Sequence, residues 1–436
     1  MTATDERCAL GGWVDEDHEA RIFRVHRAAL RSEEVFRLEV ERIFSTSWLY
    51  VGHLSELKNP GDYLVRTVGG RQVIFCLDES RELRVWLNTC PHRGTTLARE
   101  SRGTARFFRC FYHAWSFSTS GALVSLPGKE AYPADDAFRD RLGLRAVPRL
   151  ATRRGFVFVS FAADGPNLDE HLAGAGEHLD LVADHCAAGM EVLDGTQTYG
   201  VKGNWKLAVE NAMDGYHFMP THATFVEYLK SSGFATSDEG GLVENLGNGH
   251  SVMTLSGHSG RVGLDWEPRF GDAERVRIDE VRAELVERLG PDRASRIADH
   301  SRIFFVFPNL LMFDIEALSI RMLEPTSART TDVTAWHLAP RDEPDHVRSL
   351  RLRTLVSFIG PGGLATPDDI EAYESIQRGI ESTAGDLRPG VDWNDISRGM
   401  ADELAGNKCR SVDEASIRGF WRHWNSQMTA DRLTPR

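Results

Sequence analysis

Apolar residues change their spacing along the first half of the chain, and each change marks an expected element. Residues 1–31 show no strong pattern and are interpreted as an N-terminal arm. Apolar positions at helical spacing follow, which predicts a helix capped by Ser32. From Tyr63 the pattern changes to short β-type runs separated by turn residues, which predicts a small β-domain that closes near residue 165. Its expected strands span residues 63–68, 71–77, 83–87 and 155–161.

The second half of the chain mixes helical and strand patterns. Residues 231–262 are rich in Gly and Ser, and we interpret them as a long loop, suited to a substrate lid, in which His250 and His258 are solvated. Helices are expected over residues 204–213, 272–299 and 411–428, the last with an aromatic face that favours core or subunit packing. Four apolar runs predict an antiparallel sheet, over residues 303–307, 310–313, 319–324 and 333–338.

Composition narrows the class of protein without identifying it. The chain has 436 residues, enough for two domains, and its 41% hydrophobic and 26% charged content is that of an ordinary soluble protein. A net charge of -13 argues against nucleic-acid binding. No apolar run approaches the roughly 20 residues that span a bilayer, and the N-terminus lacks a secretory pattern, so a cytoplasmic location without membrane contact is expected. The 6 cysteines are scattered, which argues against a disulfide framework.

Two cysteines stand at short, regular offsets from histidines. Cys90 and His92 form one pair, and Cys110 and His113 form a second pair on a separate stretch. Four such ligands suit a structural zinc ion. They also suit a Rieske [2Fe–2S] cluster, in which two thiolates bind one iron and two imidazoles bind the other. The Rieske interpretation is favoured because each stretch supplies one Cys and one His, with Gly94 suited to a tight loop and aromatic residues near the second pair.

A second histidine pair follows the helix expected over residues 204–213. Asp214, His217 and His222 lie within nine residues, and a carboxylate pair, Asp368-Asp369, lies far downstream. Two imidazoles and one carboxylate form the facial triad of non-haem Fe(II) oxygenases. On an unbroken helix the two histidines would lie about 140° apart. Pro220 stands between them, and a helix break there is expected to turn His222 back toward the metal.

Both motifs together resemble the large (α) subunit of Rieske non-haem iron aromatic-ring-hydroxylating oxygenases. The resemblance covers most of the chain and implies an α+β fold, with a Rieske β-domain placed before a helix-grip, START-like catalytic domain whose antiparallel sheet wraps around helices. The expected domains are an arm and helix over residues 1–44 that pack with the catalytic domain, a Rieske domain over 45–165 and a catalytic iron domain over 166–436. In the family the third iron ligand precedes a Gln-Arg-Gly run, and the matching residue here is Asp369, with Asp368 as a cap or neighbouring group.

The resemblance also implies how electrons reach the iron. The cluster, held by the two Cys and His pairs named above, passes electrons to the mononuclear Fe(II) of a neighbouring subunit through an Asp between two histidines. The matching residues are Asp214, His113 and His217, and Asn211 is a polar neighbour of the iron. Electrons originate from NAD(P)H and arrive through a separate reductase, with or without a ferredoxin. The implied assembly is a homotrimer or an α3β3 complex with a small β subunit.

The implied reaction is dihydroxylation of an aromatic ring by O2 to give a cis-dihydrodiol. The runs that contain Gln377 and Trp421 resemble oxygenases of aromatic carboxylates, whose substrate would pair with a buried arginine that the sequence does not single out. Three alternatives stay open: a Rieske monooxygenase or demethylase, a Rieske electron carrier without oxygenase activity, and a zinc-stabilised binding module.

Overall fold

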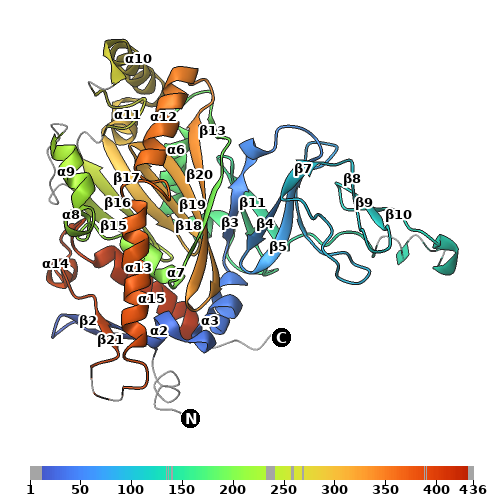
Figure 1. Ribbon diagram of the computed structural model, residues 1–436, viewed down its shortest axis with the longest axis horizontal. Helices are drawn as coiled ribbons and strands as arrows, with labels where there is room; N and C mark the ends of the chain where they lie inside the picture. The colour runs from blue at the N-terminus through green and yellow to red at the C-terminus, as the bar shows by residue number, and fades with distance from the viewer. Residues whose placement is uncertain are drawn as a thin grey trace. The chain divides into compact units, whose positions relative to one another are not determined.

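The chain folds into two compact units (Figure 1). The computed structural model describes residues 12–430 except 134, 136, 139–140, 232–240, 257–259, 268–269, 387 and 389. The smaller unit, Phe44–Leu168, is an insertion in the sequence of the larger unit, Met1–Ile43 with Asp169–Arg436. Within the described part of the chain, no helix combines the length and the apolar character needed to cross a bilayer.

The smaller unit consists of short antiparallel strands, which confirms the β-domain predicted from the sequence. Its sheets have the orders β6-β5-β4-β7, β11-β12-β3 and β10-β9-β8. Its core includes Ile74, Phe117 and the two cysteines of the first motif, Cys90 and Cys110. The strands are β3 (Leu49–His53), β4 (Asp62–Val68), β5 (Arg71–Leu77), β6 (Leu83–Leu87), β7 (Arg102–Thr104), β8 (Phe107–Arg109), β9 (Ser116–Ser118), β10 (Leu123–Ser125), β11 (Arg149–Arg153) and β12 (Phe156–Ser160).

A nine-stranded antiparallel sheet organises the larger unit and confirms the sheet predicted in the second half. Its order is β13-β20-β19-β18-β17-β16-β15-β22, and β14 also pairs with β20. The strands are β13 (Met190–Val192), β14 (Gln197–Val201), β15 (Gly241–Gly247), β16 (His250–Ser256), β17 (His300–Val306), β18 (Leu310–Ile315), β19 (Ala317–Ser327), β20 (Thr330–Pro340) and β22 (Cys409–Arg410). A separate small sheet joins β1 (Val14–Asp17), β2 (Ile22–His26) and β21 (Trp393–Asp395).

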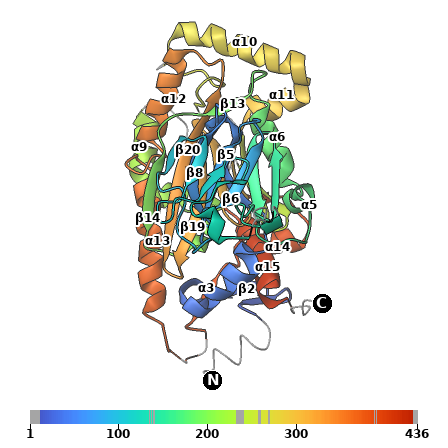
Figure 2. The same ribbon diagram turned by 90° about the vertical axis from the view of Figure 1, so that its right-hand side faces the viewer.

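Helices cover both faces of the large sheet (Figure 2). Phe304 packs against His178 of α6 at 5.8 Å between ring centroids, whereas its neighbour Phe305 packs against Phe420 of α15 at 5.8 Å. Because successive side chains of a strand point to opposite faces, α6 and α15 lie on different faces. Trp205 of α7 also packs on Phe420, at 5.7 Å, so α7 and α15 share one face.

The helices largely follow the predicted ranges. The predicted charged stretch is two helices that meet at Gly290, where Pro291 starts the second one. Trp421 and Trp424 of α15 are fully buried, which confirms its aromatic face as core packing. The helices are α2 (Ala28–Arg31), α3 (Glu33–Glu39), α5 (Leu168–Leu172), α6 (Ala175–Ala183), α7 (Trp205–Ala212), α8 (Phe218–Thr221), α9 (Ala223–Ser231), α10 (Asp272–Leu289), α11 (Pro291–Ala298), α12 (Asp345–Ser357), α13 (Thr366–Glu381), α14 (Met400–Leu404) and α15 (Ala415–Thr429).

The interpretation of residues 231–262 as one long loop is wrong. Most of the described part of this range forms the hairpin β15–β16, which lies inside the large sheet. His250 is not solvated: it is 1% exposed, and its Nδ1 accepts a hydrogen bond from the Phe307 N–H at 2.8 Å. His258 lies outside the described residues. The Gly and Ser content concealed a strand pattern because Gly247 only ends β15 and Gly249 lies in the turn before β16, so neither interrupts a strand.

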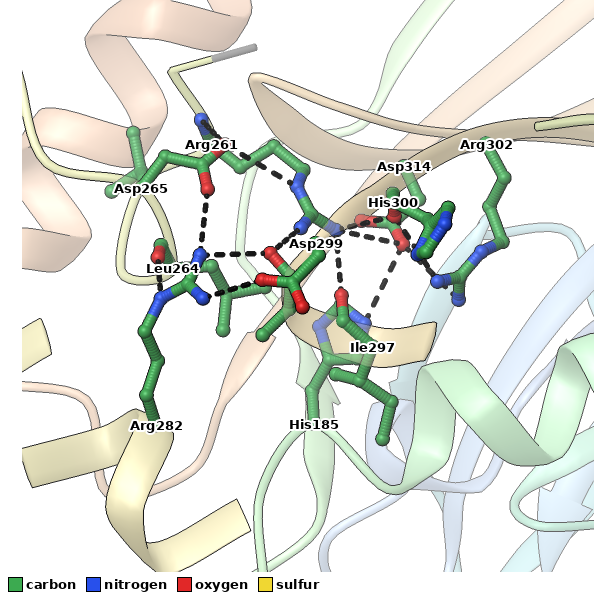
Figure 3. Close-up of polar contacts among 12 residues, drawn as sticks. His185, Arg261, Leu264, Asp265, Arg282, Ile297, Asp299, His300, Arg302 and Asp314 are labelled. Carbon is green, nitrogen blue, oxygen red and sulfur yellow. Dashed lines mark hydrogen bonds and ion pairs between the residues drawn. The ribbon is translucent and has the colours of Figure 1, made fainter. Parts of the chain in front are cut away.

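A buried ionic network lies at the end of the sheet near α10 and α11 (Figure 3). Asp314, at the end of β18, is 3% exposed, and its Oδ2 lies 3.5 Å from His185 Nε2. The same oxygen lies 3.6 Å from Nη1 of Arg261 and 3.6 Å from Nη1 of Arg302. Burial opposes ionisation of Asp314, but the imidazole and the two guanidinium groups outweigh it and hold the pKa of the carboxyl well below its usual range.

We expect Asp314→Asn to lower the free energy of unfolding by about 3 kcal/mol, because it leaves two buried guanidinium groups without their shared anion. Asp299→Asn is the matched control. Asp299 also pairs with an arginine, Arg282, at 2.7 Å, but its side chain is 49% exposed, so its loss should cost less than about 1 kcal/mol. Urea unfolding of both variants measures the difference. Equal losses of unfolding free energy would show that burial does not make the ion pairs of Asp314 more stabilising than that of Asp299.

We expect the stability of the protein to fall as the pH decreases from about 6.5 toward 4. Burial, together with Arg302 and Arg296, lowers the pKa of His178 to about 4. Below pH 6.5 the unfolded chain therefore binds a proton at this residue that the folded chain does not bind. The loss at His178 reaches up to about 3 kcal/mol at pH 4. His178→Gln should flatten the dependence of the melting temperature on pH over this window, and an unchanged slope would contradict the assignment.

Candidate metal centres

Two short helices place the histidines of the second motif. The Asn204 side chain accepts a hydrogen bond from the Lys206 N–H at 3.1 Å and so caps α7. After α7 the chain makes a tight turn in which Asp214 Oδ1 accepts a hydrogen bond from the Tyr216 N–H at 2.7 Å. His217 immediately precedes α8 and His222 immediately follows it.

The expected helix break at Pro220 is wrong. Pro220 lies inside α8, within the first turn of this helix. The N–H groups of a first turn have no acceptor within the helix, so a proline there removes no helical hydrogen bond. The His222 N–H donates to the Phe218 carbonyl at 3.1 Å. The chain is instead interrupted before His217 and again at His222. These two interruptions bring the imidazole ring centroids to 5.3 Å from one another.

The carboxylate of the set comes from the first turn of α13. Pro367 occupies one of the first positions of this helix, and Asp368 and Asp369 follow it. Proline and acidic residues are both favoured there, because the first N–H groups are free and the helix dipole is positive at this end. The first turn therefore places two carboxylates side by side, and only Asp369 is directed between the two imidazoles.

Three ligand atoms converge at this point. Asp369 Oδ1 lies 3.5 Å from His217 Nε2 and 3.2 Å from His222 Nε2. The ligand atoms of the three residues all lie within 4.8 Å of one another. Ligands about 2.1 Å from one metal ion and at right angles to each other would be roughly 3 Å apart. The three residues therefore fit one face of a metal ion and leave its opposite face open, as a facial triad requires.

The electrostatics of the three residues favour a cation between them. Burial opposes a charge on His217, but Asp214 and Asp369 outweigh it and raise the pKa of His217 to about 9. Burial likewise opposes a charge on Asp369, but both imidazoles hold the pKa of this carboxyl well below its usual range. The group thus stabilises a positive charge at its centre, which a bound metal ion would provide.

Two loops of similar conformation hold the first motif. In one loop the Cys90 carbonyl accepts a hydrogen bond from the Gly94 N–H at 2.8 Å. In the other loop the Cys110 carbonyl accepts one from the Ala114 N–H at 3.0 Å. Gly94 and Ala114 have positive φ angles of 73° and 60°. A left-handed residue four positions after each cysteine therefore closes both loops, at some strain for Ala114.

The side chains of these loops fit a Rieske cluster. Cys90 and Cys110 are each 2% exposed. The rings of His92 and His113 lie 4.6 Å apart, and His92 stacks on Trp115 at 4.6 Å. His113 Nδ1 is buried without a hydrogen-bond partner among the described residues, as expected for a nitrogen that binds iron. Two thiolates and two imidazoles from facing loops are the ligand set of a [2Fe–2S] cluster of this type.

Comparison with known proteins agrees with both sites. Residues 189–430 match the ring hydroxylating alpha subunit (catalytic domain), and residues 47–146 match the Rieske [2Fe-2S] domain. The chain belongs to the Rieske ring-hydroxylating dioxygenase large-subunit family. The match to the Rieske [2Fe-2S] domain and the group of His217, His222 and Asp369 agree with a [2Fe–2S] cluster and a mononuclear iron in this chain.

Individual relatives cover nearly the whole chain. It is 33% identical to the 2-halobenzoate 1,2-dioxygenase large subunit of Burkholderia cepacia, over 92% of this chain and 85% of that protein. It is 30% identical to toluate 1,2-dioxygenase subunit alpha of Pseudomonas putida, over 95% and 93%. The crystal structure of naphthalene 1,2-dioxygenase from Rhodococcus sp. bound to indole matches with a TM-score of 0.79 and 26% identity, covering 94% of this chain and 95% of that chain.

A polar shell surrounds the three candidate iron ligands of this ring-hydroxylating subunit. Asn211 Nδ2 donates to Asp369 Oδ1 at 3.1 Å, and the Tyr373 hydroxyl donates to Asn211 Oδ1 at 3.0 Å. Asp368 Oδ2 contacts His222 Nδ1 at 3.4 Å, and Asp214 Oδ2 contacts His217 Nδ1 at 3.4 Å. Each histidine thus faces a carboxylate on the ring nitrogen opposite to the one that faces the metal position. Such contacts orient an imidazole and raise its basicity.

We expect Asn211→Ala to weaken iron binding by about 10-fold, because it removes the hydrogen bond that orients Asp369. Competition with an iron chelator, with iron and cluster counted separately, measures this affinity. Tyr373→Phe is the matched control, since it removes only the hydroxyl that binds Asn211 and should change the affinity by less than about 3-fold. An unchanged iron affinity in Asn211→Ala would contradict the orienting role.

Sequence reasoning missed two buried polar residues close to this site. Tyr373 supports Asn211, and the spacing of four from Asp369 along one helix was the available signal. Arg321 donates to Thr366 Oγ1 at 2.9 Å, at the start of α13. A separate cavity of about 340 Å³ is lined by residues that include Arg261 and Asp314, and none of the three candidate iron ligands lines it.

Proposed function

We propose that this chain is the oxygenase subunit that adds both atoms of O2 to the ring of an aromatic carboxylate, giving a cis-dihydrodiol. The observation that carries this proposal is the order of similarity to known enzymes. The relatives that are 30% to 33% identical are named for 2-halobenzoate, toluate and anthranilate. The naphthalene dioxygenases and chlorobenzene dioxygenase are 27% to 28% identical.

In this proposal Cys90, Cys110, His92 and His113 hold the cluster, and the facial triad of His217, His222 and Asp369 holds the iron. When bound, the cluster supplies single electrons and the ferrous ion supplies open positions for O2. The protein keeps His217 and His222 oriented through carboxylates on their Nδ1 sides, as described above. Asn211 holds Asp369 in place by its hydrogen bond to Oδ1.

Asp214 is proposed as the bridge for electrons between subunits. Its side chain is 22% exposed, and its Oδ2 lies 3.4 Å from His217 Nδ1. One edge of the carboxylate thus contacts an iron ligand, while the residue retains an exposed part that a cluster histidine of another subunit, His113 in the partner copy, can approach. This arrangement requires a second copy of the chain, and the assembly we propose is a homotrimer or an α3β3 complex. The electrons come from NAD(P)H in the cytoplasm through a separate reductase or ferredoxin.

Turnover with labelled oxygen tests the proposal. The purified holoenzyme is supplied with a reductase, NADH, benzoate and 18O2. We expect one O2 consumed per benzoate and two labelled oxygen atoms in a cis-dihydrodiol. A single labelled atom in a phenol or in a demethylated product would instead assign the chain to the monooxygenases. Equal activity on benzoate and on neutral arenes such as toluene would contradict the preference for carboxylates.

A further inference from the structure

Arg321 is a buried cation whose partners among the described residues are all neutral. It lies on β19 and is 6% exposed. Its Nη2 donates to the Ile359 carbonyl and to Thr366 Oγ1, both at 2.9 Å, and its guanidinium carbon lies 4.3 Å from the ring centroid of Phe313. Its Nε is buried without a hydrogen-bond partner, and none of the described carboxylates pairs with it. The buried arginines of the network in Figure 3 all have such an anion.

His337 is a second unpartnered group on the same surface. It lies on β20, is 3% exposed, and neither of its ring nitrogens has a hydrogen-bond partner among the described residues. In the register of the sheet, Ser319 faces His337 and Arg321 faces Ala335. Arg321 and His337 therefore project from adjacent strands to the same face, at diagonal positions. Burial and the charge of Arg321 lower the pKa of His337 to about 4, so the imidazole is neutral at pH 7 and offers one N–H donor.

This pair lies beside the candidate iron site. Thr366, which accepts a hydrogen bond from Arg321, is the first residue of α13 and precedes Asp369 by one turn of that helix. Arg321 also influences the ionisation of Tyr373, as Asp369 does. Tyr373 binds Asn211, which binds Asp369. Arg321 thus contacts the same first turn of α13 that carries Asp369.

A buried charge is strongly unfavourable unless an anion or several polar groups compensate for it. Two neutral acceptors on one nitrogen leave most of the Arg321 donors unused. No carboxylate among the described residues pairs with Arg321, so a ligand is the partner that we consider. We propose that Arg321, assisted by the neutral His337, binds the carboxylate of the aromatic substrate. This inference rests on the function proposed above. It identifies Arg321 as the carboxylate-binding arginine that the sequence alone does not single out.

Such a contact determines orientation as well as affinity. One carboxylate oxygen accepts from Arg321 and the other accepts from His337, so the plane of the carboxylate is held at two points. The aromatic ring attached to the carboxylate is then held in one fixed orientation. Phe313, which already lies against the guanidinium, gives the aromatic ring an apolar neighbour. A neutral arene of the same size gains only the apolar part of this interaction.

Paired ligands test the assignment in the intact holoenzyme. Benzoate and nitrobenzene have the same shape, and only benzoate carries a charge. Binding to the oxidised enzyme is measured by equilibrium dialysis and by the ligand-induced shift in melting temperature, and KM is measured in turnover.

In Arg321→Gln we expect benzoate binding to weaken by about 100-fold and nitrobenzene binding by less than about 3-fold. Arg321→Lys keeps the charge without the planar donors and should lose about 10-fold for benzoate. His337→Gln should lose about 10-fold, and Arg329→Gln, in the exposed turn between β19 and β20, should bind benzoate as the wild type does.

Three results would overturn the assignment. Unchanged benzoate affinity in Arg321→Gln would show that Arg321 does not bind the substrate carboxylate. Equal loss for benzoate and nitrobenzene shows general damage to the pocket. Loss of iron together with a lower melting temperature of the ligand-free protein shows that Arg321 only supports the segment from Ile359 to Thr366. The function proposed above has its own test, which is made on the wild type before any variant. That function would be wrong if the wild type bound and oxidised benzoate no better than nitrobenzene.

Discussion

Replacing His222 with alanine is expected to remove the mononuclear iron and leave the [2Fe–2S] cluster in place. His222 Nε2 lies 3.2 Å from Asp369 Oδ1, and the imidazole is almost fully enclosed, with 5% of the side chain exposed. Its loss leaves a two-ligand site whose remaining groups, His217 and Asp369, attract each other directly. Oxidation of the aromatic ring should fall by at least about 1000-fold, because the variant would lose the metal that would supply open positions for O2.

Iron and sulfide counts separate the two sites. The wild type should contain about three irons and two sulfides per chain, and His222→Ala about two of each with an unchanged visible spectrum. His423→Ala is the matched control. His423 is another largely buried imidazole, packed against Phe307 at 4.7 Å between ring centroids, and it belongs to neither site. It should retain three irons. Loss of both metals in His222→Ala would mean that this residue supports the whole fold, and retention of three irons would mean that it is not a ligand.

The sequence was most informative where chemistry demands particular residues at particular spacings. Cys90 with His92, and Cys110 with His113, have few uses other than binding a metal or a cluster, so these pairs alone favour a Rieske domain. Strands such as β5 were equally clear because their apolar runs are short and end at turn residues. Only the resemblance favours Asp369 over Asp368, since two adjacent carboxylates in a first helical turn have the same local sequence signal.

Features that depend on tertiary packing could not be predicted. The hairpin β15–β16 resembles a loop by composition and becomes a pair of strands only because β17 and β22 extend the sheet on either side of it. The position of Pro220 suggested a helix break, but a helix as short as α8 accommodates proline. Arg321 is one of many arginines in the sequence, and only the structure shows that it is buried without an anion among the described residues.

Replacing Asp214 with asparagine is expected to slow turnover by about 100-fold or more while both metals stay bound. Asparagine keeps the shape of the side chain and its hydrogen bond to the Tyr216 N–H, so the turn between α7 and α8 should persist. It removes the negative charge 3.4 Å from His217 Nδ1, which orients and polarises a ligand and, in our proposal, connects it to the cluster of the partner subunit. Loss of the group that orients a metal ligand lowers activity by about 10- to 100-fold on its own.

Asp368→Asn is an unusually close control for this variant. Asp368 Oδ2 lies 3.4 Å from Nδ1 of the other histidine, so both substitutions remove the same charge at the same distance from an iron ligand. Asp368→Asn should slow turnover by about 10-fold, the effect of ligand orientation. The decisive measurement starts with fully reduced enzyme and benzoate, adds O2, and follows the loss of the EPR signal of the reduced cluster. If Asp214 bridges the subunits, this signal should persist in Asp214→Asn and decay promptly in Asp368→Asn. Equal decay in both variants would leave Asp214 as an orienting residue only and would require another path for the electrons.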